Sequence, residues 1–332
     1  MKQHTESIMS ITTGKTFKLA IAAAALLTPI LAGSNLPHMI SRSARGGKPA
    51  AATPASSQYR FVTIDAPGAS GTGPTGVNNT GQVSGWYFDF YFGAAGNTHG
   101  FLWQNGGLQT VDYPGASVTL LGPVTDSGLI MGEYGTETSQ HAATYNTRLA
   151  TWTNLPDIPG YPMNFGQGIN NSGVGTGEAC TGNLAVSLNC VGWTWDRGAY
   201  SFFTDPEGDP AQGGTSPEAI NNAGQVVGYF LDASGVPHGF LKNGDSFTTI
   251  DPPAASFTLA YSINDRGDIV GFYGDTTGTP HGFVRGIEGQ FTTFDVPGAF
   301  ATFLGGTDDR RDLAGSYRDQ AGNLHGFVAF KK

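Results

Sequence analysis

Short runs of apolar and β-branched residues, separated by turns rich in glycine and asparagine, recur along the chain from residue 59 onward. One stretch contains the runs Phe257–Ile263, Asp268–Tyr273, Pro280–Arg285 and Gln290–Phe294. Runs of this length bounded by turn residues are typical of β-strands. After residue 58 no apolar stripe at helical spacing lasts two turns. The pattern therefore predicts an all-β protein made of four-stranded units.

A glycine closes the second apolar run of each unit, and we call these six residues the ruler glycines. They are Gly85, Gly132, Gly177, Gly228, Gly271 and Gly315, spaced 47, 45, 51, 43 and 44 residues apart. One four-stranded blade of a β-propeller takes roughly 40–50 residues, so the spacing predicts a six-bladed β-propeller with repeats of about 45 residues. A different phasing would give five or seven blades, and a β-prism is the alternative fold.

The turn between the first two strands of a unit follows a code, with Asn or Asp in the bend and glycine last, as in Asn264-Asp-Arg-Gly267. Glycine suits a final residue with a positive φ. The sixth unit has Asp308-Asp-Arg-Arg311 instead. A left-handed conformation at Arg311 would cost about 1–2 kcal/mol, so we expect this turn to be rearranged or strained.

The ends of the array predict how it closes. The last unit stops after its third strand, at His325–Phe330, and the first apolar run, residues 60–64, resembles an unpaired fourth strand. We expect residues 60–64 to complete the sixth blade and close the ring. Closure would remove the exposed sheet edges that promote aggregation.

The N-terminus reads as an export signal. Lys15 and Lys18 precede an apolar run from Leu19 to Ala32, and Ala32-Gly-Ser34 resembles a cleavage site. The run is shorter than the about 20 apolar residues of a membrane span, although a signal anchor stays an alternative. We therefore expect a signal peptide (1–34), a flexible linker (35–58), a repeat domain (59–332) with no integral membrane span after cleavage, and a secreted or periplasmic location in a bacterium.

The net charge and the two cysteines limit which partners and metal sites are expected. From residue 58 onward there are 11 Lys and Arg against 25 Asp and Glu, a net charge of −14. Such a surface repels phosphate backbones, so nucleic acid is not an expected partner. Cys180 and Cys190 both lie in the third unit, and in an exported protein we expect them to form a disulfide. They lack nearby histidines at ligand spacing, so no zinc site is expected.

Five histidines open the third strand of their units, where an antiparallel partner brings the end of the fourth strand alongside. The predicted hydrogen-bonded pairs are His99 with Asp112, His238 with Asp251, His281 with Asp295 and His325 with Asp65. The second unit sets His141 against Asn154 or Leu155, and the third sets Val191 against Asp205. Such pairs also occur in nucleophilic and metal sites, but their repetition around a ring favours a structural role.

Recurrent aromatic residues flank these positions. Most are expected to pack between blades, since side chains alternate along strands. The functional alternative is a sugar-stacking platform beside carboxylates, for which the candidates are Trp86, Tyr87 and Asp89, or Tyr134 and Glu133.

Three glutamates, Glu133, Glu178 and Glu218, break the repeat symmetry and are the first places to look for an enzyme site. Glycoside hydrolysis needs two carboxylates in one cleft. Asp265 with Asp268, and Asp308 and Asp309 with Asp312, are acidic enough to hold a cation loosely. No calcium-binding loop with alternating acidic residues is present, and no cofactor or tightly bound metal is expected.

The phrase Ile220-Asn-Asn-Ala-Gly-Gln-Val-Val-Gly228 followed by His238-Gly-Phe-Leu, repeated at Val77–Gly85 and His99–Trp103, resembles the bacterial HAF repeats. The resemblance covers nearly all of residues 59–332 and implies export and a repeat fold, with no defined activity to transfer. We therefore expect an exported binding or interaction module for carbohydrate, another cell-surface polymer or a protein. An extracytoplasmic lyase or hydrolase acting at the central channel, and a purely structural envelope protein, stay open as alternatives.

Overall fold

A computed structural model describes residues 55–89, 97–136, 139–182 and 189–332 of the chain. The predicted signal peptide and the predicted linker up to residue 54 lie outside these residues. The last four residues of that linker, Ala55–Gln58, form the 3-10 helix η1, in which Ser56 is buried. A search of the described residues finds no helix with the length and hydropathy needed to cross a membrane.

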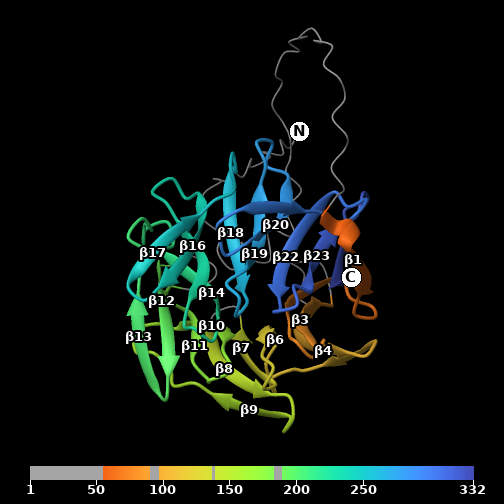
Figure 1. Ribbon diagram of the computed structural model, residues 1–332. Helices are drawn as coiled ribbons and strands as arrows, with labels where there is room; N and C mark the ends of the chain where they lie inside the picture. The colour runs from red at the N-terminus through yellow and green to blue at the C-terminus, as the bar shows by residue number, and fades with distance from the viewer. Residues whose placement is uncertain (1–54, 90–96, 137–138, 183–188) are drawn as a thin grey trace, which may run out of the picture.

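The described strands pair antiparallel in successive groups of four along the chain (Figure 1). The groups are β2 (Gly71–Val77), β3 (Val83–Phe88), β4 (Thr98–Gln104) and β5 (Gly107–Thr110); β6 (Val118–Val124), β7 (Leu129–Thr136), β8 (Ser139–Asn146) and β9 (Thr151–Asn154); β10 (Met163–Ile169), β11 (Gly175–Thr181), β12 (Asn189–Asp196) and β13 (Ala199–Phe203); β14 (Thr215–Ile220), β15 (Val226–Leu231), β16 (Pro237–Asn243) and β17 (Ser246–Ile250); β18 (Phe257–Ile263), β19 (Ile269–Gly274), β20 (Pro280–Arg285) and β21 (Phe291–Phe294); and β22 (Ala301–Thr307), β23 (Leu313–Arg318), β24 (Leu324–Lys331) and β1 (Tyr59–Ile64). The fold is all-β, as the sequence predicts.

The N-terminal strand β1 pairs with the C-terminal strand β24. Their antiparallel register runs from Tyr59 opposite Lys331 to Ile64 opposite Gly326. Ile64 is 2% exposed and packs with residues of β2, β3, β4, β23 and β24. The first apolar run of the domain is thus the fourth strand of the last group.

The ruler glycines make room for aromatic rings between the sheets. Gly85 lies opposite Phe101, and the same register sets Gly271 opposite Phe283. A Cβ at Gly271 would come within 2.0 Å of the Leu259 carbonyl oxygen. Five of the aromatic residues two positions into the third strands are at most 1% exposed: Phe101, Trp193, Phe240, Phe283 and Phe327. The repeat phrase therefore encodes sheet-to-sheet packing, which stabilises the array through buried apolar area.

A β-bulge interrupts the first strand of each group. A bulge leaves a residue unpaired in the ladder and re-aims its side chain. In β14 the unpaired residue is Glu218, and in β18 it is Tyr261. This irregularity supplies two residues of the acidic cluster described below.

Candidate functional site

The predicted histidine–aspartate pairs lie within hydrogen-bond distance. The Nδ1 atom lies 2.7 Å from Asp112 for His99, 2.7 Å from Asp251 for His238, 3.0 Å from Asp295 for His281 and 2.9 Å from Asp65 for His325. Nε2 faces a second carboxylate, at 3.1 to 3.7 Å, from Asp89, Asp232, Asp275 and Asp319 respectively. Each imidazole is thus held between two acidic loops of its own sheet.

His141 differs from the expected arrangement. Its Nδ1 is 2.8 Å from Asp157, not beside Asn154 or Leu155. Asp157 lies past the end of β9, in the connection to β10, so strand register could not reveal it. In the third group Asp205 is buried, and its carboxylate accepts a hydrogen bond from the Glu207 backbone N–H at 2.9 Å.

The aromatic residues expected to form a sugar platform are largely covered. Trp86 is 6% exposed and belongs to a buried apolar cluster. Tyr134 stacks on Tyr113 with ring centroids 3.5 Å apart. Tyr87 stacks on His99, and its hydroxyl lies 2.9 Å from Thr110 Oγ1. Trp86 belongs to the core and the two tyrosine rings are covered by stacked neighbours, so the geometry does not favour this group as a ligand platform.

A different aromatic group includes one ring that is open to solvent, on the outer strand of the third sheet, beside two half-buried tyrosines. Phe202 of β13 is 51% exposed. Its ring is nearly parallel to Tyr161 (centroids 6.1 Å apart, 18°) and to Tyr200 (6.2 Å, 21°). Centroids more than 6 Å apart are too distant for direct face-to-face stacking, so the rings are offset from one another. We call Tyr161, Tyr200 and Phe202 the aromatic platform.

Hydrogen bonds and a ring contact hold Tyr200 of the aromatic platform in place. The Tyr200 hydroxyl donates to the Pro156 carbonyl oxygen at 2.9 Å and accepts from Asn164 Nδ2 at 3.2 Å, and the ring packs edge-on against buried Trp193. Burial raises the pKa of Tyr200, the Asn164 hydrogen bond lowers it, and the nearby charge of Asp157 raises it. The 77% exposed Asp157 carboxylate therefore lies close to the platform. The sequence offered one clue, the alternation of Tyr200 and Phe202 on one strand face, but Tyr161 joins them only through the fold.

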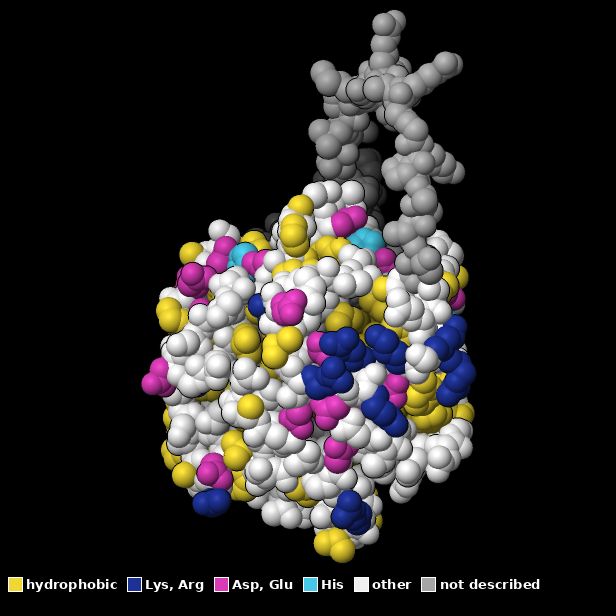
Figure 2. All heavy atoms as spheres, in the orientation of Figure 1, with side chains coloured by type: hydrophobic (Ala, Val, Ile, Leu, Met, Phe, Trp, Pro, Cys, Tyr) yellow, Lys and Arg dark blue, Asp and Glu magenta, His cyan; other side chains and the backbone are white. Residues whose placement is uncertain are grey.

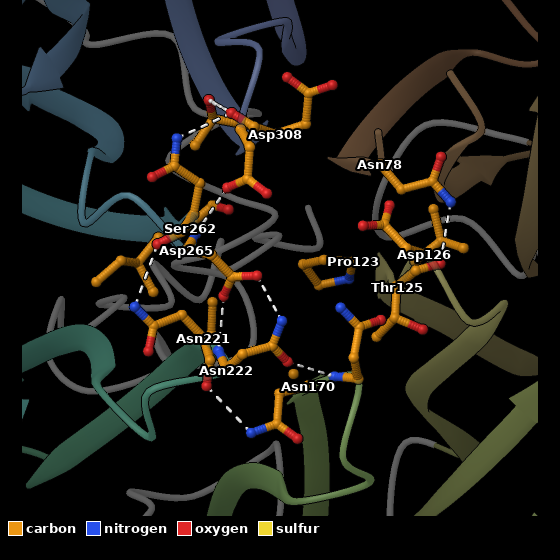
Figure 3. Close-up of a pocket in the computed structure, with 18 of the residues that line it drawn as sticks. Asn78, Pro123, Thr125, Asp126, Asn170, Asn221, Asn222, Ser262, Asp265 and Asp308 are labelled. Carbon is orange, nitrogen blue, oxygen red and sulfur yellow. Dashed lines mark hydrogen bonds between the residues drawn. The ribbon is translucent and has the colours of Figure 1, made fainter. Parts of the chain in front are cut away.

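The glycine-ended turns meet at one mouth of the ring of sheets and surround a pocket of about 90 Å³ (Figure 3). Side chains of the first turn position bond to the next turn: Asn78 Nδ2 donates to the Thr125 carbonyl oxygen, Asn221 to Asn264 and Asn264 to Asp308, at 2.9 to 3.1 Å. At the second position, backbone N–H groups donate to the next side chain, including Asp265 to Asp309 and Asp309 back to Asn79. The asparagine code thus links neighbouring turns and joins the last turn to the first.

Three acidic residues of these turns, Asp268, Asp308 and Asp312, have arginine partners. Arg311 binds Asp268 through Nε at 2.8 Å, and Arg310 binds Asp308 and Asp312 at 3.0 and 2.9 Å. Arg311 has a φ of 66°, so the strained form of this turn is the one observed. On the face seen in Figure 2, Lys and Arg side chains gather near β22 and the C-terminus. Arginine side chains thus neutralise Asp268, Asp308 and Asp312, which the sequence marks only as acidic enough to hold a cation loosely.

The three asymmetric glutamates come from neighbouring sheets and lie close enough for the charge of Glu178 to act on the other two. Glu133 and Glu178 each follow a ruler glycine by one residue, as Tyr229 does, so the repeat register places them alike in neighbouring sheets. Burial raises the pKa of Glu133 to about 8, and the charge of Glu178 adds to the rise. Burial, then Glu178 and Glu133, raise the pKa of Glu218 well above its ordinary value. Glu133 is therefore mostly protonated at neutral pH and can donate a hydrogen bond or a proton.

The disulfide predicted from the sequence is confirmed, since Cys180 of β11 and Cys190 of β12 are bonded. Within the described ranges, the group of potential metal ligands within 4.8 Å of one another comprises Glu178 and these two cysteines. Because the disulfide occupies both sulfur atoms, this group does not offer a thiolate metal site.

No family model and no curated protein matches the chain. Among solved structures, a gluconolactonase from Xanthomonas campestris covers 88% of this chain and 99% of its own at 12% identity, with a TM-score of 0.50. TolB from Acinetobacter baumannii (12% identity, TM-score 0.49) covers 71% of this chain, which spans 60% of TolB. A lectin from Aleuria aurantia, solved with Fucα1-6GlcNAc, has 8% identity and a TM-score of 0.47, covering 82% of this chain and 94% of the lectin. At these identities the likeness shows the fold alone, a β-propeller.

Proposed function

We propose that this chain is an exported six-bladed β-propeller of HAF-type repeats, closed by β1, that binds carbohydrate at the aromatic platform. The observation that carries the proposal is the ring of Phe202, which is 51% exposed and nearly parallel to the rings of both Tyr161 and Tyr200. A pyranose ring has an apolar C–H face and a hydroxyl edge. It is therefore suited by aromatic rings beside polar groups, the usual composition of a small-molecule site.

Polar groups stand close to the rings. The Asp157 carboxylate is 77% exposed, although its Oδ1 lies 2.8 Å from His141 Nδ1. Burial is the main cause that raises the pKa of Tyr200, and the charge of Asp157 adds to the rise. A carboxylate accepts hydrogen bonds from sugar hydroxyls, which fixes the orientation that stacking leaves free. Tyr200 is held by Asn164, Pro156 and Trp193, so little side-chain entropy is lost when a ligand binds.

The closed ring supports the same function because it makes the scaffold rigid. The pairing of β1 with β24 and the hydrogen bond from Asp309 to Asn79 both connect the last repeat to the first. A binding residue on a strand of such a ring is positioned more accurately than one on a loop.

The test is a screen of the full-length protein against oligosaccharides and polysaccharides, followed by titration of each hit. We expect Phe202→Ala to weaken binding by about tenfold or more, the loss typical of one central aromatic contact. Phe300→Ala is the matched control, because Phe300 is 57% exposed and belongs to the connection between β21 and β22. Binding that is equal in both variants, or no saturable binding to any glycan, would overturn the proposal.

A further inference from the structure

The three asymmetric glutamates form a cluster that the carbohydrate proposal does not use. Glu133, Glu178 and Glu218 come from three neighbouring sheets, and the charge of Glu178 reaches both of the others. Glu133 is 4% exposed and Glu218 is 6% exposed. Burying a carboxyl group is costly unless it is paired or hydrogen-bonded, so the buried Glu133 and Glu218 call for a partner.

Other buried carboxylates of the described chain have partners: Asp205 accepts a hydrogen bond from a backbone N–H, and two others bind arginine. The Asp268 and Asp308 side chains are 2% and 1% exposed, and each binds an arginine. The groups that shift the pKa of Glu133 and Glu218 are instead burial and carboxylates, with no basic side chain among them. Glu133 and Glu218 therefore lack the kind of arginine partner that Asp268 and Asp308 have.

Two buried polar atoms at the cluster have no hydrogen-bond partner. One is Oε2 of Glu133 itself, and the other is the hydroxyl of Tyr261. Burial raises the pKa of Tyr261, and the charges of Glu218 and Glu178 add to the rise, so Tyr261 lies near these two glutamates. Buried polar groups are nearly always hydrogen-bonded in native proteins, so these two atoms mark a position for a bound group.

The spacing of the cluster favours a large cation over a metal ion. In the described part of the chain, the oxygens of the three glutamates do not form a set lying within 4.8 Å of one another. Metal ligands crowd more closely, since calcium–oxygen distances are about 2.3–2.6 Å. An organic ammonium group is wider and can contact several carboxylates that are further apart.

Aromatic rings complete the surroundings. Tyr229 and Tyr261 interact with the same glutamates and belong to an apolar cluster with Trp86, Phe272 and Phe303. Tyr261 stacks on Phe272 at 5.5 Å and, like Glu178, is only partly buried, so the cluster is within reach of solvent. Cations bind over aromatic faces, most strongly where water is excluded.

We propose that Glu133, Glu178 and Glu218, with Tyr229 and Tyr261, form a binding site for an organic ammonium group. The ammonium charge supplies the compensation that the buried carboxyl groups lack. Its N–H or polarised C–H groups face Glu133 Oε2 and the Tyr261 hydroxyl. The site is separate from the aromatic platform, so it holds or fails independently of the carbohydrate proposal.

Tetramethylammonium chloride is the probe, titrated into the full-length protein by calorimetry at pH 8.5 and constant ionic strength, with sodium chloride as the blank and calcium chloride in a parallel arm. We expect saturable tetramethylammonium binding that Glu133→Gln and Glu218→Gln each weaken by about tenfold or more. Asp196→Asn is the matched control, since it removes a 57% exposed carboxylate of the β12–β13 hairpin, and it should leave binding unchanged.

Proton release is the second readout, because a bound cation favours the ionised form of Glu133. Binding heats measured at pH 7.5 in two buffers of different ionisation enthalpy should differ for the native protein and agree for Glu133→Gln. A response to calcium without one to tetramethylammonium would replace the ammonium site by a metal site. No response to either probe, or equal binding in the glutamine variants, would overturn the proposal.

Discussion

Arg311 has two opposing effects on the stability of the fold: its backbone is strained, and its side chain forms an ion pair. It occupies the turn position where the five other units have glycine with a positive φ, and its own φ of 66° costs about 1–2 kcal/mol. Its guanidinium binds Asp268 through two hydrogen bonds of 2.8 and 3.0 Å. Removing one partner of a buried ion pair costs about 3–5 kcal/mol.

The lower end of that range applies, because Arg311 is 40% exposed and Asp268 keeps a hydrogen bond from Asn264 at 3.3 Å. Lost pairing therefore outweighs relieved strain, and Arg311→Gly should lower the free energy of unfolding by about 1–2 kcal/mol. Urea unfolding at pH 7, followed by tryptophan fluorescence, measures the change. The same substitution in an Asp268→Asn background should be neutral or stabilising, because only the strain is left to remove.

The pH dependence checks the cause. Burial alone would raise the pKa of Asp268, but hydrogen bonds from Arg311 and Asn264 outweigh it and lower the pKa. The pair therefore stabilises the fold above the unfolded-state pKa of about 3.9 and is lost as the pH falls through the lower folded-state pKa. The deficit of Arg311→Gly should shrink over that range. An Arg311→Gly protein as stable as the native one at pH 7 would refute the reasoning.

Three further predictions concern the scaffold. Burial alone would lower the pKa of His99, but its hydrogen bonds to Asp112 and Asp89 raise it. The stability that these bonds contribute is therefore present below pH about 6.5 and lost as the pH rises through the folded-state pKa. Thermal unfolding of Asp112→Asn should show a larger loss of stability at pH 5.5 than at pH 8.5, and an equal loss at both pH values would contradict the assignment. Replacing Cys180 and Cys190 by serine should cost about 2–3 kcal/mol in urea unfolding, and no loss would show that the disulfide does not constrain the unfolded chain. Deleting residues 58–66 removes β1 and its pairing with β24, so the unfolding temperature of the whole domain should fall, and an unchanged temperature would count against ring closure.

The repeat made the strands predictable, because the same pattern of apolar runs and turn residues recurs in successive units. Phe257–Ile263 and Pro280–Arg285 were predicted with the bounds that β18 and β20 have. Strand register likewise indicated the partner of His99. It failed for His141, whose partner Asp157 lies in an irregular connection beyond β9.

The candidate sites were harder to predict because they depend on contacts between units. Glu133 and Glu218 stood out as departures from the repeat, but the bulge that aims Glu218 inward is not a property of its local sequence. Trp86 looked like a ligand residue and is instead core, since the opposite residue, Gly73, leaves space for its ring. Tyr161 joins Phe202 only when the connection before β10 packs against β13, which no periodicity encodes.

The structure of the protein bound to the oligosaccharide selected by the binding screen tests the central proposal most directly. The account predicts a sugar ring in van der Waals contact with Phe202 and Tyr161, with a hydroxyl group bonded to Asp157. A sugar bound elsewhere, such as in the pocket at the asparagine-lined mouth, would contradict it.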